Sequence, residues 1–207
     1  NHIDSLKKIK LNKENIFKKY FLNKNEEYCV LLLHPDGTSK KRNKHYIDIV
    51  IKALSYFKIR VFCIFPCTDI GYESIVDSLK KISKINKNFK VFSNLIYSDF
   101  INLIKFSRFF IGNSSSGIIE SPYLKTPFLN LGNRQKNRLK SNNIISADFN
   151  YKDIIKKIKF IKSKKFTRSI QRTNLYYGNG KSYEIAFAKI IKLIKKIGIN
   201  KKFNEIS

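Results

Sequence analysis

The chain has 207 residues, of which 43% are hydrophobic and 14% aromatic, and this composition suits one folded domain and excludes a disordered chain. Its formal net charge of +27 comes from 42 basic residues, mostly lysines spread along the whole sequence. Proteins that read phosphates and bases favour the forked arginine side chain. The charge therefore predicts weak adhesion to polyanions and no specific nucleic-acid partner.

Targeting signals and metal ligands are not expected. No apolar run is long enough to cross a membrane, and the N-terminus lacks a secretion signal, so we expect a cytoplasmic protein without a membrane partner. Cys29, Cys63 and Cys67 lie in or beside apolar runs, which predicts buried thiols and no disulfide framework. No metal-binding pair of cysteines or histidines accompanies them, so neither a metal nor a cofactor is expected.

Strand-like and helical segments alternate along most of the chain. A short amphipathic helix is expected at 13–22, and in 43–57 the apolar side chains recur at the spacing of one helix face. Further helices are expected at 73–85, 98–106 and 117–124, between strands at 28–33, 59–65, 89–93, 108–112, 127–132 and 143–146.

These elements predict a doubly wound α/β fold. The six strands lack a clean apolar and polar alternation, as is typical of strands covered on both faces. Repeated strand and helix units of this length predict a Rossmann-like parallel sheet with right-handed crossovers. The helical segments 151–166 and 181–197 are expected to cover the sheet or to reach another domain. Because no linker or repeat divides the chain, residues 1–207 are expected to form one domain.

Four loops are candidates for a ligand site. In an open parallel sheet, ligands bind outside the carboxyl ends of the strands. The loops expected there carry suitable polar residues and read HPDGTSKK (34–41), PCTDIG (66–71), GNSSSG (112–117) and GNRQKNR (132–138).

The loop GNSSSG is the strongest of them, because it joins a strand to a helix. A helix N-terminus offers unpaired N–H groups and a partial positive charge, which favour a phosphate. Ser114, Ser115 and Ser116 add hydroxyl donors, and Gly112 and Gly117 let the backbone turn tightly. A helix cap needs only one hydroxyl. From the spacing alone, anion binding and simple capping are equally supported.

Charged residues near these loops are open to two interpretations. Glu120, expected on the first helical turn, would face the ribose of a nucleotide bound at the serines, or would close a capping box with Gly117. His34 directly follows an apolar strand and should project at the top of the sheet, although a lone histidine is more often structural. Asp69 and Arg134 occupy equivalent loops, and each taken singly reads as a solvated residue.

Several segments together resemble the UDP-N-acetylglucosamine 2-epimerases, specifically the hydrolysing branch. The matching stretches are HPDGTSKK, FPCTDIGYESI, FIGNSSSGIIESPYLKTPFLNLGNRQKNR and NLYYGNGKSYEI, in the family's order and spacing. The chain is similar to the C-terminal, UDP-holding half of a two-domain fold like that of the GT-B glycosyltransferases. The resemblance implies that a further, N-terminal domain carries most of the catalytic carboxylates.

The resemblance also implies an activity and a division of roles. The family eliminates UDP from a UDP-sugar and hydrates the resulting glycal to N-acetylmannosamine or a diacetamido relative, a precursor of sialic and other nonulosonic acids. It implies that Ser114 and Ser115 hold the diphosphate, and that Glu120 holds the ribose. A protonated His34 would stabilise the leaving phosphate. The remaining residues expected around UDP are Asn113, Ser116, Gly117, Arg134, Gln135 and Asp69.

The chain by itself is expected to bind UDP weakly and to catalyse nothing, and self-association into a homo-oligomer is left open. Non-hydrolysing epimerases form one alternative, but they typically have paired glutamates where this chain has one. Retaining GT-B glycosyltransferases carry a second glutamate seven or eight residues further on, where this chain has Pro127 and Phe128. A basic nucleic-acid-binding module is the third alternative. Thr68 and Asn137 depart from the epimerase pattern, and these departures concern substrate preference.

Overall fold

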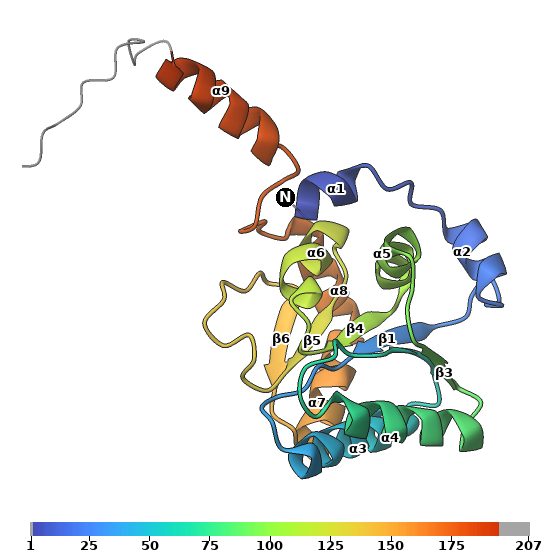
Figure 1. Ribbon diagram of the computed structural model, residues 1–207. Coiled ribbons are helices and arrows are strands. Elements are labelled where there is room, and N and C mark those ends of the chain that lie inside the picture. The colour runs from blue at the N-terminus through green and yellow to red at the C-terminus, as the bar shows by residue number, and fades with distance from the viewer. Residues whose placement is uncertain (1, 195–207) are drawn as a thin grey trace, which may run out of the picture.

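The computed structural model describes residues 2–194, and it contains the predicted parallel sheet of six strands (Figure 1). The strands lie in the order β3-β2-β1-β4-β5-β6 and every neighbouring pair is parallel. This is the strand order of a Rossmann fold, so the predicted fold class is confirmed. The strands are β1 (Tyr28–Leu32), β2 (Arg60–Ile64), β3 (Phe89–Phe92), β4 (Phe109–Gly112), β5 (Phe128–Leu131) and β6 (Ile144–Ala147).

Helices cover both faces of the sheet, which explains why the strands read as continuous apolar runs. Every residue of β1, β4 and β5 is buried. One face carries α3 (Lys40–Ser55), α4 (Tyr72–Ile85), α7 (Tyr151–Ile161) and α8 (Lys164–Ser169), which a 3-10 turn, Ile170–Arg172, follows. The other face carries α1 (His2–Lys7), α2 (Lys13–Lys19), α5 (Tyr97–Phe106) and α6 (Ser116–Leu124).

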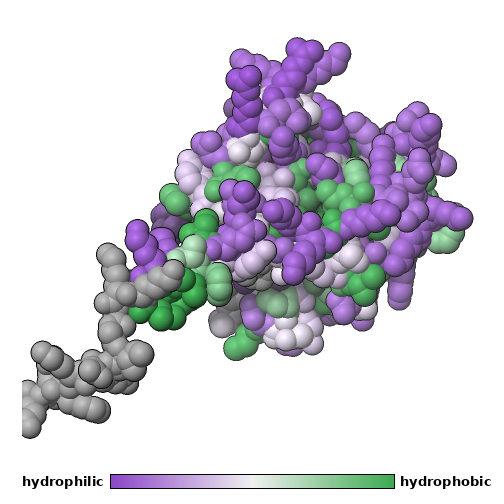
Figure 2. Space-filling model, turned by 90° about the horizontal axis from the view of Figure 1, so that it is seen from above, coloured by the Kyte–Doolittle hydropathy of each residue, from purple (hydrophilic) through white to green (hydrophobic). Residues whose placement is uncertain are grey.

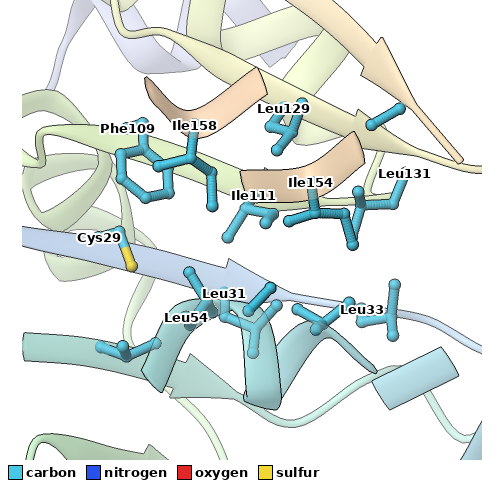
Figure 3. Packing of buried hydrophobic residues seen from close by; sticks show 14 of the residues in the cluster. Cys29, Leu31, Leu33, Leu54, Phe109, Ile111, Leu129, Leu131, Ile154 and Ile158 are labelled. Carbon is cyan, nitrogen blue, oxygen red and sulfur yellow. The ribbon is translucent and has the colours of Figure 1, made fainter. Parts of the chain in front are cut away.

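The hydrophobic core is divided by the sheet into two clusters. Alternate side chains of a strand point to opposite faces, so Leu31 packs with α3 and α7 while Val30 packs on the other side. Figure 3 shows the first cluster, in which Leu54 of α3 and Ile158 of α7 flank the strands. The central strands are therefore held from both faces, and the loops at their ends start from fixed positions.

The first C-terminal helical segment differs from the expectation, and the second follows the alternative in which it does not cover the sheet. The segment expected as one helix at 151–166 is two helices, because Lys162 ends α7 and the Ser163 hydroxyl caps α8 by accepting a hydrogen bond from Phe166 N. The helix α9 (Ser182–Ile194) does not cover the sheet but extends away from it (Figure 1), and none of its side chains is buried. Its predicted last turn, 195–197, lies outside the described residues.

The cysteine and membrane predictions have mixed outcomes. All three cysteines are free thiols, and Cys29 and Cys63 are buried in the core. The prediction was wrong for Cys67, which is partly exposed because it lies in the loop after β2 and not in a strand. Among residues 2–194, no helix combines the length and the apolar character that a membrane span requires.

The place where the strand order reverses lies between β1 and β4, and a glycine brings these two strands together. Gly112 ends β4 with φ +143°, and a Cβ atom there would lie 1.9 Å from the carbonyl oxygen of Leu32. A side chain at this position would push β4 away from β1. The residues that follow each strand, His34 and Asn113, therefore meet only because position 112 is glycine.

We predict that Gly112→Ala lowers the free energy of unfolding by about 3 kcal/mol, because it adds a clash with backbone to an unfavourable φ. Gly180→Ala is the matched control. Gly180 also has a positive φ of +81°, but the nearest atom to its added Cβ would be the flexible side chain of Lys7 at 3.1 Å. The control should cost about 1 kcal/mol. Urea unfolding measures both, and equal losses would contradict the close approach of β1 and β4.

Candidate functional site

Polar residues of four loops meet at the carboxyl edge of the sheet. His34 follows β1, Cys67 and Asp69 follow β2, and the serine loop follows β4, while Arg134 and Gln135 follow β5. Hydrogen bonds connect all four loops. This edge is where a doubly wound sheet binds its ligands, and the structure brings the predicted residues together there.

Asn113 joins the loops on either side of the strand-order reversal. Its side chain is fully buried. The Oδ1 atom accepts a hydrogen bond from His34 N at 2.7 Å, and Nδ2 donates to His34 O at 2.9 Å. Both polar ends of the amide are therefore used within the protein. Asn113 holds His34 in place, which is a different role from the predicted contact with a ligand.

Gln135 and Arg134 both donate to the main-chain carbonyl of Asn113, from Nε2 at 3.0 Å and from Nη1 at 3.3 Å. The two residues have different surroundings. Gln135 is buried, so it supports the loop from below. The Arg134 side chain keeps about a third of its surface exposed, and its Nη2 atom lies 3.9 Å from Asp69 Oδ2. Arg134 therefore brings a positive charge to the rim of the site.

The surroundings of His34 favour an uncharged imidazole, whereas the resemblance implied a protonated one. Burial first, and then the nearby charge of Arg134, lower its pKa to about 4, although the charge of Asp69 acts in the opposite direction. The Nδ1 atom accepts a hydrogen bond from Cys67 N at 3.1 Å, and the Cys67 thiol lies at 3.1 Å from the same atom. A half-buried ring next to a guanidinium does not readily take up a proton at pH 7.

The loop after β2 connects the histidine to the arginine. Cys67 Sγ donates to Asp69 Oδ2 at 3.0 Å, and Asp69 in turn faces Arg134. Burial and the hydrogen bond to Asp69 raise the pKa of the Cys67 thiol, so the thiol stays protonated at neutral pH. The sequence predicted Asp69 at the site, whereas it predicted Cys67 as a buried core residue because Cys67 lies beside an apolar run.

The three serines differ in their contacts, and these contacts bear on the choice between helix capping and anion binding that the sequence left open. Ser114 is buried, and its hydroxyl accepts a hydrogen bond from Ser116 N at 3.3 Å at the start of α6. Ser115 is the N-cap residue, yet its hydroxyl makes no capping bond. Within residues 2–194, neither the Ser115 nor the Ser116 hydroxyl bonds another protein group. One serine therefore serves the helix, and the other two hydroxyls are left for a ligand.

Gly117 allows the start of α6 to lie against the sheet. A Cβ atom there would lie 2.1 Å from the ring of Phe128 in β5, so any side chain would lift the helix away. Its place inside the helix also excludes the capping box in which Gly117 was the cap. Gly117 sets the position of the serines.

Glu120 lies one turn further into the helix than predicted. Because α6 begins at Ser116, Glu120 is in its second turn, and its side chain is buried. Tyr97, the first residue of α5, is close to it. Burial and then the charge of Glu120 and a hydrogen bond to it raise the pKa of Tyr97 to about 12. Tyr97 was not among the residues predicted for the site, although the loop between β3 and α5 starts at this same edge.

The site combines a helix N-terminus, free hydroxyls, an arginine and a neutral histidine, which is an arrangement suited to an anion. No group of three or more metal-ligating side chains occurs in the described part of the chain. The fold defines a Rossmann-like class of α/β domain, with this site at the carboxyl edge of its sheet.

The sequence model of the UDP-N-acetylglucosamine 2-epimerase family matches residues 2–195, and the chain belongs to this family. It is 29% identical over 196 residues to the polysialic acid biosynthesis protein P7 of Escherichia coli, covering 94% of this chain and 47% of that protein. It is 31% identical over 167 residues to a hydrolysing GDP/UDP-N,N'-diacetylbacillosamine 2-epimerase of Campylobacter jejuni, covering 77% of this chain and 41% of that protein.

A solved structure has the same fold. The UDP-GlcNAc 2-epimerase of Methanocaldococcus jannaschii, crystallised with UDP-GlcNAc and UDP, superposes with a TM-score of 0.66 at 20% identity, covering 94% of this chain and 52% of that one. The chain thus spans about half the length of the relatives it matches, and it corresponds to their C-terminal portion.

We predict that acid destabilises the fold through His34. The pKa of its ring is about 4 in the folded domain and 6.5 ordinarily, so between these pH values the unfolded chain binds a proton that the folded one does not. The unfolding free energy should therefore fall from pH 7 to pH 4.5, by about 1–2 kcal/mol from this residue after allowance for solvent screening.

Urea unfolding at the two pH values measures this loss. The variant His34→Gln should lack that part of the decline, while His45→Gln, which removes an exposed histidine of α3, should keep it. A decline in His34→Gln as large as in the wild type would contradict the neutral state of His34.

Proposed function

We propose that this chain is the UDP-binding half of a hydrolysing UDP-N-acetylglucosamine 2-epimerase. The observation that carries the proposal is the start of α6, which has two serine hydroxyls that the protein does not use. The loop before it is bonded through Asn113 to His34 and to Arg134, at the reversal of strand order. A diphosphate placed there would receive the two hydroxyls and one guanidinium, and the partial positive charge of the helix start would favour it. These donors are fixed before the ligand binds, which is what stabilisation of a departing anion requires.

The position of Glu120 supports a nucleotide in this place. Glu120 lies four residues after Ser116, and a helix rises about 1.5 Å per residue, so its carboxylate is about 6 Å along α6 from the phosphate site. A ribose attached to the diphosphate spans a similar distance. With Tyr97 beside it, the carboxylate would accept hydrogen bonds from the ribose hydroxyls.

The chemistry of the proposed reaction requires a second half. Elimination of UDP needs a base for the sugar proton, and hydration of the glycal needs an acid and a base. In the described site, Glu120 is buried beside Tyr97 and Asp69 is engaged by Cys67 and Arg134. We therefore assign the catalytic carboxylates to an N-terminal domain outside this chain, with the sugar held between the two halves.

Helix α9 supports the same division. Its apolar side chains gather on the surface (Figure 2), and Tyr183, Phe187 and Ile194 are each more than half exposed. The start of α9 is tied to α1, since Ser182 N donates to Asp4 Oδ1 at 3.2 Å. The first described helix, α1, and the start of the last one, α9, therefore lie at one place on the domain. We assign the apolar side of α9 to contact with the N-terminal domain.

Two findings support the hydrolysing reaction over the non-hydrolysing one. The related diacetylbacillosamine epimerase is named as hydrolysing. The helix after the serines carries a single glutamate, Glu120, where non-hydrolysing members are expected to have a pair. The similarity to a polysialic acid biosynthesis protein supports a role in the synthesis of sialic or other nonulosonic acid precursors.

We predict that UDP binds this chain and raises its melting temperature. At a hundredfold excess over Kd, UDP should stabilise the domain by about 2.7 kcal/mol, which corresponds to about 5–10 °C. The double variant Ser115→Ala with Ser116→Ala should lose the shift, because it removes the two hydroxyls that the protein does not use and keeps the Ser114 hydroxyl that bonds to Ser116 N. Thermal unfolding with and without UDP measures both.

Ser83→Ala, near the C-terminal end of α4, is the matched control and should keep the full shift. An unchanged response in the double variant would overturn the assignment of the serines. If UDP has no effect on the wild type and the chain binds DNA in a salt-sensitive way, the nucleic-acid alternative is favoured instead.

We further predict that the full-length protein releases free UDP from UDP-N-acetylglucosamine or from a diacetamido UDP-sugar, together with the sugar inverted at carbon 2. Coupled UDP detection and NMR of the sugar product measure the two products. Ser83→Ala in the full-length protein again serves as the control for a distant serine. Formation of an epimeric UDP-sugar without release of UDP would assign the protein to the non-hydrolysing branch.

A further inference from the structure

The loop 66–71 contacts His34 in a way that the UDP site does not by itself require. Cys67 approaches the ring twice, with its main-chain N and with its Sγ, each at 3.1 Å from Nδ1. The same Sγ lies 3.0 Å from Asp69 Oδ2, and Asp69 lies 3.9 Å from Arg134. One continuous chain of contacts thus runs from the histidine ring through Cys67 and Asp69 to Arg134.

The main-chain contact decides where the ring carries its hydrogen. An amide N–H can only donate, so the Cys67 amide directs its hydrogen at Nδ1, and that nitrogen must be the acceptor. A hydrogen on Nδ1 would point at the amide hydrogen of Cys67 and be repelled by it. The thiol hydrogen points either to Asp69 or to Nδ1, and in both cases Nδ1 stays an acceptor. The ring hydrogen is left for Nε2.

We propose that the loop 66–71 fixes His34 as the neutral tautomer protonated on Nε2, so that His34 meets the departing diphosphate as an uncharged hydrogen-bond donor. Cys67 and Asp69 are positioning residues in this arrangement. The identity of the ligand rests on the proposed function, whereas the tautomer rests only on the contacts of the ring. Neither depends on a residue outside the described part of the chain.

The groups around His34 agree with this state. Asn113, from the loop after β4, is neutral and holds the histidine main chain on both sides. Arg134 is the cation that faces the ring from the loop after β5, and Asp69 is the anion that faces it from the loop after β2. Burial outweighs the carboxylate, and the pKa of His34 falls to about 4. Arg134 and the start of α6 then provide the positive charge, and His34 provides an uncharged hydrogen-bond donor with a fixed direction.

The tautomer can be measured directly in the 15N-labelled chain by long-range 1H–15N correlation of the three histidines. The variant His34→Gln assigns the signals of His34 by their absence. We expect a bare Nδ1 and a protonated Nε2 at pH 7, with no imidazolium above pH 5. A hydrogen on Nδ1, or an imidazolium signal at pH 6, would overturn the proposal.

Variants of Cys67 distinguish the effect of its main-chain N–H on the His34 tautomer from the effect of its thiol. Cys67→Ala keeps the amide N–H and should keep the Nε2 tautomer, whereas Cys67→Pro removes this donor and should give a mixture of both tautomers that titrates at a higher pH. A mixture in Cys67→Ala would contradict the part assigned to the amide. If Cys67→Pro does not fold, the spectra of the wild type and Cys67→Ala still decide the question.

Two charge variants change the pH at which His34 titrates, which a purely structural role of these residues would not do. Arg134→Gln removes a cation and should move the His34 titration to higher pH, and Asp69→Asn removes an anion and should move it to lower pH. Shifts in the same direction, or no shift in either variant, would contradict the proposed coupling of the ring to both groups.

UDP binding by His34 variants tests whether His34 acts as an uncharged hydrogen-bond donor. A glutamine amide places an N–H group near the position of Nε2 and carries no charge at any pH. We expect His34→Gln to keep its UDP affinity within about threefold and His34→Ala to lose about tenfold, the usual effect of a missing hydrogen bond to a charged group. Equal losses in both variants would favour an imidazolium and overturn the proposal. If the wild type fails to bind UDP, the proposed function fails, while the NMR result still decides the tautomer.

Discussion

The buried side chain of Asn113 is the contact on which the site depends. The amide pairs with both the main-chain N–H and the main-chain carbonyl of His34, across the only place in the sheet where the strand order reverses. A buried amide left without partners costs about 1–3 kcal/mol, so each loop is held by the other. The carbonyl of Asn113 extends the same restraint to Arg134 and Gln135. The donors at this edge are therefore in place before a ligand binds.

The distribution of charge in the site differs from that of the chain as a whole. The net charge of +27 comes mostly from lysines, but the cation held among the hydrogen-bonded loops is Arg134, and His34 beside it is neutral. A guanidinium keeps its charge when partly buried, whereas an imidazole loses its charge there. The site thus combines one permanent charge with several directional donors, which is the arrangement that the proposed diphosphate site requires.

The domain has two kinds of surface that serve different purposes in the proposed enzyme. The carboxyl edge of the sheet is polar and internally braced, while α9 carries exposed apolar side chains and joins the body of the domain near α1. A helix with an unburied apolar side lowers its free energy when another surface covers it. This is consistent with a chain that spans half the length of its relatives.

The sequence by itself determined the six strands, the helices between them, the loops at the carboxyl edge and most of the residues near the site. These follow from local periodicity and from the rule that parallel strands end at one edge. The tertiary structure alone decided the pairing of Asn113 with His34, the neutral state of that histidine, the place of Cys67 in the site and the contact of Glu120 with Tyr97. The physical reason is distance along the chain: Asn113 and His34 are 79 residues apart and Cys67 and His34 are 33 apart, so burial and hydrogen bonding at these positions depend on how separate loops pack together.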